Sequence, residues 1–108
     1  MSRGVVATPL YARRLREFLG EYSKKGAVRL LERLRASHRA MLENLGRFDE
    51  MAPVRRRTVG GRRVTLREYL LEACARDFLV LHWVPPSESE PVVLLNLRIG
   101  GQNRFRWR

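Results

Sequence analysis

The pattern of apolar and polar residues is clearest in the last third of the chain, where two apolar runs flank a proline-rich joint. Asp77–Val84 and Val92–Ile99 are rich in β-branched, leucine and aromatic residues, which suit strands. The joint, Pro85–Pro91, cannot continue either strand because proline lacks the backbone donor. Both runs are apolar at nearly every position, which is typical of strands covered on both faces. The pattern therefore predicts a central hairpin that other parts of the chain cover.

The first half of the chain shows helical periodicity after a short apolar start. A strand is expected at about Val5–Thr8, and Thr8 followed by Pro9 is a typical helix entry, with threonine as the N-cap. Apolar residues then recur at spacings of three and four, and Ser23–Gly26 marks a break. The same spacing predicts a second helix over about Ala27–Gly46. Two such helices with a short joint form an antiparallel hairpin, whose apolar face is available to cover the strands.

The middle of the chain leaves alternatives open. Val54–Val59 fits a ragged edge strand that turns at Gly60–Gly61, and it fits a mobile basic loop equally well. Thr65–Ala73 starts like a helix, because Thr65 and Glu68 have the spacing of a capping box. The same residues also alternate as a strand would.

Length and composition limit the class of protein. The 108 residues correspond to a single domain over 1–108, and 44% hydrophobic residues exclude a wholly disordered chain. No apolar run is long enough to span a bilayer, and the N-terminus has no secretory apolar region, so we expect no membrane partner. The single cysteine, Cys74, indicates a reducing, cytoplasmic setting. The absence of a Cys/His cluster leads us to expect neither a metal nor a cofactor.

The formal charge of +11 is carried almost wholly by arginine. Such a field favours nucleic acid or another acidic partner, although a genome rich in arginine codons would raise the arginine content of any solvated surface. The distribution is therefore more informative than the total. Two segments, 53–67 and 98–108, contain no acidic residue, and codon usage does not explain that segregation readily.

Several segments, taken in order, resemble the RelE/ParE superfamily of bacterial toxins from type II toxin–antitoxin systems. They are VVATPLYARRL at the start, an N-L-x-x-F segment at Asn44–Phe48, and then LREYLLEACARDFLVLHWV and PVVLLNLRIGGQNR. The resemblance covers nearly the whole chain and implies that Thr65–Ala73 is a strand. It implies an α+β fold of order β-α-α-β-β-β, with an antiparallel sheet packed against an N-terminal helical hairpin. His82 stands where the family often has tyrosine, and Gly101 stands near its common histidine.

The resemblance implies a growth-inhibiting toxin that a cognate antitoxin neutralises. RelE-like members cleave mRNA on the ribosome, and ParE-like members inhibit DNA gyrase. Cleavage through the RNA 2′-hydroxyl needs a proton acceptor, cations for the phosphate and an acid for the leaving oxygen. RelE-like sites draw these groups from arginines, lysines and a histidine or tyrosine near the C-terminus, and this chain has neither histidine nor tyrosine there. His38, His82 and Tyr69 remain, but each fits a packing role in its predicted element, so no catalytic residue is assigned.

A protein that inhibits gyrase by binding needs only a complementary surface. The C-terminal segment interleaves arginine with Phe105 and Trp107, which are typical interface residues and also stack on bases. A frayed, solvated terminus is the plainer interpretation. The candidate target-binding residues are Arg98, Gln102, Asn103, Arg104, Arg106 and Trp107. The secondary basic surface, which fits a solvated loop or a docking site for an acidic antitoxin, is Arg55, Arg56, Arg57, Arg62, Arg63 and Arg67.

The sequence thus favours a ParE-like, non-enzymatic inhibitor of DNA gyrase with a cognate antitoxin. The first alternative is a RelE-like mRNA endoribonuclease that acts on the ribosome. The second is a non-toxic nucleic-acid-binding module with the same fold.

Overall fold

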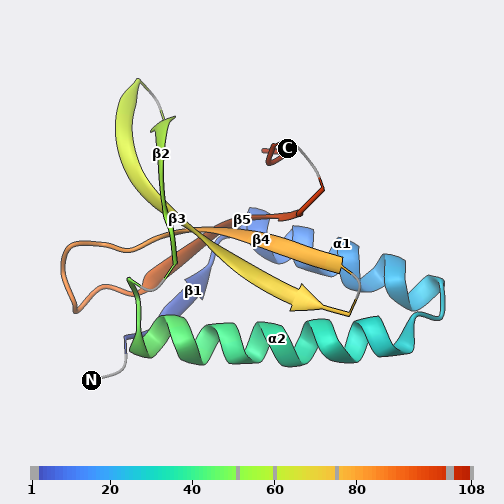
Figure 1. Ribbon diagram of the computed structural model, residues 1–108. Coiled ribbons are helices and arrows are strands. Elements are labelled where there is room, and N and C mark those ends of the chain that lie inside the picture. The colour runs from blue at the N-terminus through green and yellow to red at the C-terminus, as the bar shows by residue number, and fades with distance from the viewer. Residues whose placement is uncertain (1–2, 51, 60, 75, 102–103, 108) are drawn as a thin grey trace.

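The computed structural model describes residues 3–50, 52–59, 61–74, 76–101 and 104–107 (Figure 1). Within β2 and β3, five residues are described by their backbone alone, namely Arg56, Arg57, Val59, Arg62 and Arg63. The helices are α1 (Pro9–Lys24) and α2 (Val28–Arg47). The strands are β1 (Val5–Ala7), β2 (Val54–Val59), β3 (Arg62–Ala73), β4 (Arg76–Trp83) and β5 (Val92–Ile99).

The strands form one five-stranded sheet in the order β1-β5-β4-β3-β2, which confirms the predicted α+β class. The predicted antiparallel arrangement holds for β2 to β5, but β1 pairs with β5 in parallel, so the sheet is mixed. A parallel pair needs a long connection between its strands, and here everything between β1 and β5 serves as that connection. Val5 lies opposite Val92 and Ala7 opposite Leu94.

Strands β2 and β3 settle the two open alternatives of the middle segment. Val54–Val59 is an edge strand, and the strand that the resemblance implied at Thr65–Ala73 is confirmed as part of β3. The alternative helix, which Thr65 and Glu68 favoured by their spacing, is wrong. Side chains along β3 alternate between the two faces of the sheet, and both faces gain packing contacts. Tertiary packing therefore overrides the local capping signal. Tyr69 and Leu71 pack against the helices, whereas Leu66 packs on the opposite face of the sheet.

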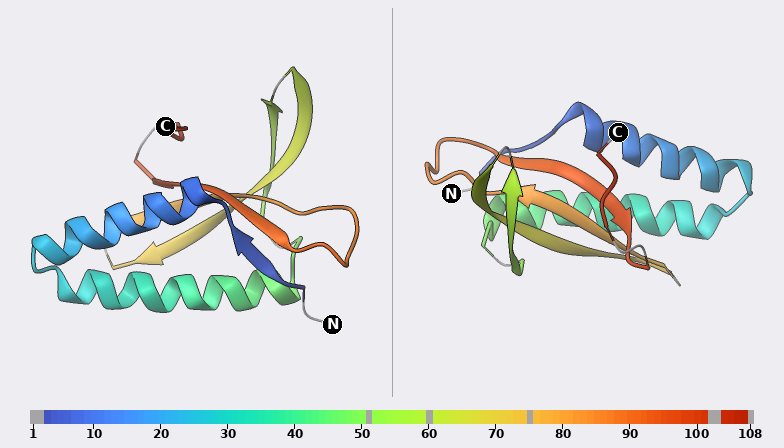
Figure 2. Two further views of the ribbon diagram at one scale, coloured as in Figure 1. Left: turned by 180° about the vertical axis from the view of Figure 1, so that it is seen from behind. Right: turned by 90° about the horizontal axis from the view of Figure 1, so that it is seen from above.

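The helical hairpin lies on one face of the sheet, with α1 against β5 and α2 against β3 (Figures 1 and 2). Thr8 is the N-cap of α1, as predicted: its Oγ accepts the Tyr11 N–H at 3.3 Å. The same hydroxyl donates to the Leu94 carbonyl at 2.9 Å, which ties the helix start to β5. At the other end of the hairpin, Gly46 touches the N-terminal segment so closely that a Cβ there would lie 2.8 Å from the Arg3 carbonyl oxygen.

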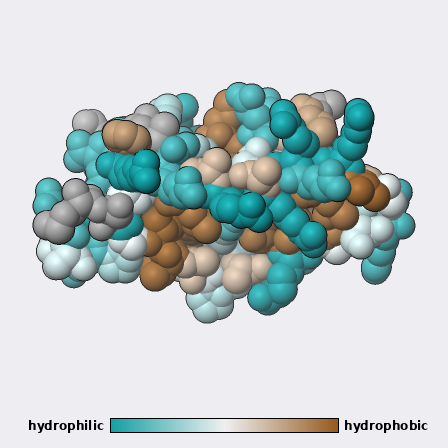
Figure 3. Space-filling view, turned by 90° about the horizontal axis from the view of Figure 1, so that it is seen from below, coloured by the Kyte–Doolittle hydropathy of each residue, from teal (hydrophilic) through white to brown (hydrophobic). Residues whose placement is uncertain are grey.

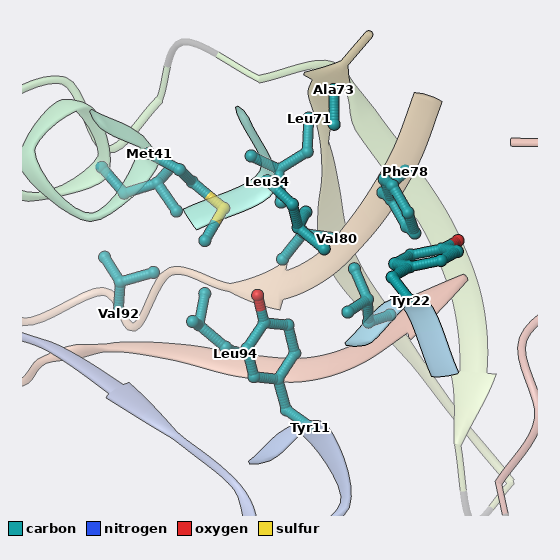
Figure 4. Close-up of a cluster of buried hydrophobic side chains, with 12 residues drawn as sticks. Tyr11, Tyr22, Leu34, Met41, Leu71, Ala73, Phe78, Val80, Val92 and Leu94 are labelled. Carbon is teal, nitrogen blue, oxygen red and sulfur yellow. The ribbon is translucent and has the colours of Figure 1, made fainter. Parts of the chain in front are cut away.

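The main core fills the space between the hairpin and the sheet (Figure 4). Its largest members include Tyr11, Tyr22 and Phe78, and the Tyr22 and Phe78 rings meet edge to face at 6.2 Å between centroids. Burial of the Tyr11 and Tyr22 hydroxyls raises the pKa of both side chains. The aliphatic part of the core is made by Leu34, Met41, Leu45, Leu71, Ala73, Val80, Val92, Leu94 and Leu97.

The opposite face of the sheet carries a smaller cluster, formed by Leu66, Leu81 and Phe105. The central hairpin is therefore covered on both faces where Phe105 packs, as its continuous apolar runs predicted. A register shift in the β4–β5 ladder pairs Leu81 with Asn96 but His82 with Leu94, which leaves Leu95 as an extra residue on β5. Neither described helix is long and apolar enough to cross a membrane.

Candidate functional site

The candidate site is the face of the sheet that the helical hairpin leaves uncovered, here called the open face. Strand register places three polar residues on it beside apolar ones. Glu68 of β3, Leu81 of β4 and Asn96 of β5 stand side by side across three strands. In the next row, Arg98 of β5 lies opposite Leu79 of β4. The open face thus offers a carboxylate, an amide and a guanidinium around an apolar centre.

The C-terminal segment folds back across this face (Figures 1 and 2). The Phe105 side chain is only 5% exposed and packs on Leu66 and Leu81. The Arg98 guanidinium lies over the Phe105 ring, 5.1 Å from its centroid. Asn96 holds Arg106, the residue after Phe105, because its Nδ2 donates to the Arg106 carbonyl at 2.6 Å. The described part of the segment, residues 104–107, is therefore docked against the sheet, and we call it the C-terminal strap.

The candidate residues of the strap have different exposures. Arg104 and Arg106 are exposed, and Trp107 is 53% exposed beside the Phe105 ring. Arg98 is half-buried beneath the strap. The predictions for Gln102 and Asn103 lie outside the described residues. The described residues thus present two exposed cations and a large aromatic surface on a buried phenylalanine anchor.

A buried carboxylate adds a group that the sequence-based site lacks. Glu68 is 6% exposed, and its Oε2 lies 3.4 Å from Nε of Arg55 on the neighbouring strand. The sequence analysis places Glu68 in the strand that the resemblance implies but assigns it no functional role, and its spacing from Thr65 also fits a helix cap. Its place between Leu66 and Leu70 in an alternating run was the signal that could have assigned it to the open face. Asn96, the lone neutral polar residue of the last apolar run, carried a similar signal.

The secondary basic surface does not act as one unit. Arg55 pairs with Glu68, and Arg67 is used to hold the chain, since its Nη1 donates to the carbonyls of Glu50 and Ala52 at 3.0 and 2.7 Å. The other four members lie in the paired backbone of β2 and β3, and their side chains are outside the described structure. They are Arg56, Arg57, Arg62 and Arg63.

The groups able to exchange protons near neutral pH lie on the helix side of the sheet. His82 is fully buried opposite Leu94, with Nδ1 3.3 Å from the Val80 carbonyl oxygen, and burial lowers its pKa. His38 is half-buried on α2 beside the Tyr11 ring, and burial lowers its pKa as well. The Tyr69 hydroxyl accepts from Asn44 of α2 at 3.0 Å. With Tyr11 and Tyr22 in the main core, both histidines and all three tyrosines are remote from the strap.

Two hollows lie away from the open face. One is a groove of about 300 Å³ between α1 and α2, lined by Leu15, Leu19 and Leu42 with Arg35 and Arg39 beside them. Figure 3, which views the side of the molecule that carries the helices, shows apolar patches among polar residues there.

The second hollow, of about 550 Å³, lies beside Trp83 and the residues that follow α2. Its two arginines already have partners: Arg67 holds backbone carbonyls, and Arg3 binds Asp49 with Nε at 3.3 Å. This hollow is larger than the groove, but its arginines hold parts of the fold together. Among the described residues, no group of three or more His, Cys, Asp or Glu side chains is placed to hold a metal ion.

Comparison of the chain with protein-family models, with curated proteins and with solved structures gives no match.

Proposed function

We propose that this protein is the growth-inhibiting toxin of a type II toxin–antitoxin pair, acting in the cytoplasm by binding and inhibiting DNA gyrase. Three features support the proposal. The sequence segments resemble the RelE/ParE superfamily in order and spacing. The helical hairpin on one face of the sheet is the arrangement which that resemblance implies. The C-terminal strap supplies an exposed tryptophan flanked by arginines, which suits a protein interface.

The observation that favours binding over cleavage is the position of the histidines and tyrosines. RNA cleavage needs an acid to protonate the leaving 5′-oxygen, and a displaced proton must be accepted from the 2′-hydroxyl. His82 and Tyr69 are on the helix side of the sheet, and Phe105 and Trp107 of the strap have no proton to exchange at neutral pH. The described open face supplies one carboxylate, Glu68, but no second group to protonate the leaving oxygen, so its cations and aromatic rings are better suited to recognition.

An antitoxin would find a site on the helical side. The groove between α1 and α2 is apolar along its floor, and Arg35 and Arg39 give its rim positive charge. An amphipathic helix with acidic flanks would match both features, because it buries apolar side chains and pairs carboxylates with the arginines. This groove faces away from the open face, so both partners have separate surfaces.

Glu68 favours a second candidate function, ribosome-dependent mRNA cleavage. Its carboxylate would take the proton of the 2′-hydroxyl, whose oxygen attacks the phosphorus and expels the 5′-oxygen. Arg55, 3.4 Å from Glu68, would stabilise the charge that develops on the phosphate. The proton for the departing oxygen would then have to come from water or from the ribosome, because the described open face offers no second acid.

A gyrase supercoiling assay with matched variants tests the proposal. The wild-type protein should inhibit supercoiling at stoichiometric excess, and Trp107→Ala should weaken inhibition strongly, since Trp107 is exposed and contributes little to the fold. Glu68→Gln should inhibit as the wild type does. No inhibition by the folded wild-type protein would refute the gyrase proposal.

Mapping of mRNA 5′ ends after induction separates the second candidate. Codon-phased cuts that disappear in the Glu68→Gln variant would establish cleavage and would place the base at Glu68. Normal growth after induction of the folded protein without its antitoxin would refute both toxin functions and leave the non-toxic nucleic-acid-binding module.

A further inference from the structure

The β2–β3 hairpin projects from the body of the molecule as a two-stranded ribbon (Figures 1 and 2). β2 packs mainly on β3, and the register pairs Val54 with Arg67 at the base and Val59 with Arg62 at the far end. Those six pairs correspond to a length of about 17 Å at the usual strand rise. Gly61, next to the far end, has a φ of 77°, a conformation that glycine adopts readily. We call the paired residues 54–59 and 62–67 the ribbon.

The charge of the ribbon is concentrated in its outer part. The segment 53–67 contains six arginines and no acidic residue. The two arginines nearest the body are engaged, Arg55 by Glu68 and Arg67 by backbone carbonyls. The remaining four, Arg56, Arg57, Arg62 and Arg63, occupy positions in the outer four pairs of the ladder. The ribbon itself therefore supplies no carboxylate to balance those four charges.

This concentration of positive charge lowers the stability of the ribbon when no polyanion is bound. Two-stranded ribbons are marginal in water, and a concentration of like charge weakens them further although no two arginines are directly opposite in the ladder. Valine and threonine at the intervening positions supply strand propensity, but Thr58 and Thr65 are exposed and bury little surface. An external array of negative charge would remove the repulsion and stabilise the ribbon.

We propose that the ribbon binds double-stranded DNA by entering its major groove. A B-DNA major groove, about 12 Å wide, admits a two-stranded ribbon, and phosphates line it on both sides. Consecutive positions of a strand belong to opposite faces, so arginine positions occur on both faces of the ribbon. Charge on both faces suits a groove that encloses the ribbon, whereas a protein partner would meet one face or one edge. The inference is independent of the proposed action on gyrase.

Salt-dependent binding of the full-length chain to a short DNA duplex of mixed sequence tests the inference. The test variant carries Arg56→Gln, Arg57→Gln, Arg62→Gln and Arg63→Gln. The control variant removes the same charge from exposed positions of the helices outside the antitoxin groove, with Arg16→Gln, Arg29→Gln, Arg33→Gln and Arg47→Gln. Fluorescence anisotropy at salt concentrations between about 50 and 200 mM gives the slope of log K against log salt.

The ribbon variant should reduce the magnitude of that slope by about 3 to 4, since each neutralised phosphate contributes about 0.9. The control variant should change it by less than about 1. The milder pair Arg57→Gln and Arg62→Gln should give about half the effect, which keeps the test valid if the fourfold variant folds poorly. Equal losses in the ribbon and control variants would overturn the inference and indicate non-specific attraction to a basic protein.

The choice of duplex and competitor tests whether the ribbon enters the major groove. Binding to an RNA duplex of the same length should be much weaker, because its major groove is deep and narrow. The bound protein should protect guanine N7 from methylation, since N7 lies in the major groove. Equal affinity for the RNA duplex, or unprotected N7, would overturn the placement in the groove. Full competition by polyglutamate at equal charge would assign the ribbon to an acidic protein instead.

Discussion

Replacing Phe105 with alanine should release the C-terminal strap from the open face. The side chain is only 5% exposed and packs on Leu66 and Leu81, so its truncation removes nearly the whole apolar anchor. Loss of this burial costs about 2 kcal/mol, and loss of the Arg98 contact adds about 0.5 to 1 kcal/mol. The strap is a terminal segment and detaches instead of enclosing a cavity, so we expect the free energy of unfolding to fall by about 2 to 3 kcal/mol.

Urea denaturation followed by far-ultraviolet circular dichroism measures this change, with Trp107→Ala as the matched control. Trp107 is 53% exposed, so its truncation should cost no more than about 1 kcal/mol. Trypsin should also cleave Phe105→Ala faster after Arg104 and Arg106, because a released strap is accessible. Equal, small losses of stability in the two variants, together with unchanged proteolysis, would refute the docked strap.

Three further changes test other parts of the structure. Gly46→Ala should lower the free energy of unfolding by about 1 to 3 kcal/mol in urea denaturation, because the new Cβ would lie 2.8 Å from the Arg3 carbonyl; a neutral result would contradict that close contact. Burial lowers the pKa of His82, so the unfolded chain binds the proton more readily and stability should fall as pH drops below about 6.5, by at most about 1.4 kcal/mol per pH unit for this histidine. Thermal denaturation across that range should show a shallower fall for His82→Gln, and an identical profile would contradict the assignment. Arg35→Glu with Arg39→Glu should weaken neutralisation by the antitoxin while gyrase inhibition persists, and unchanged neutralisation in a growth assay would place the antitoxin elsewhere.

The sequence predicts the elements of the fold well where one local signal dominates. Thr8 followed by Pro9 specifies the start of α1, and the continuous apolar runs specify β4 and β5. Where two local signals compete, the outcome depends on contacts that the sequence does not display. Thr65 and Glu68 have helix-capping spacing, but Tyr69 and Leu71 gain burial against the helices only in a strand. The parallel pairing of β1 with β5 joins segments at opposite ends of the chain, so no local pattern indicates it.

The candidate site was predictable in its cations and aromatic residues but not in its arrangement. The arginines and Trp107 of the strap are evident from composition. Their attachment to the sheet depends on Asn96, whose amide reaches the Arg106 carbonyl across a bend in the chain. Glu68 belongs to the site because β3 continues through it, a strand that the resemblance implied although the local capping signal competed with it.

The roles of individual arginines show how a charge of +11 divides between structure and recognition. Arg3 and Arg67 hold backbone carbonyls, Arg14 pairs with Glu17 and Arg55 pairs with Glu68, so removing any of these removes a structural contact as well as a charge. Codon usage alone would scatter the remaining arginines over the surface among acidic residues. The outer ribbon and the strap each lie in a segment that contains no acid, and so do the arginines of residues 1–16, of which Arg3 and Arg14 have structural partners. Substitutions there remove charge from segments without acid, whereas the exposed helix arginines outside the antitoxin groove, Arg16, Arg29, Arg33 and Arg47, provide the matched background. A loss of function confined to the ribbon or to the strap would therefore identify recognition, and an equal loss from these four helix positions would identify the net charge alone.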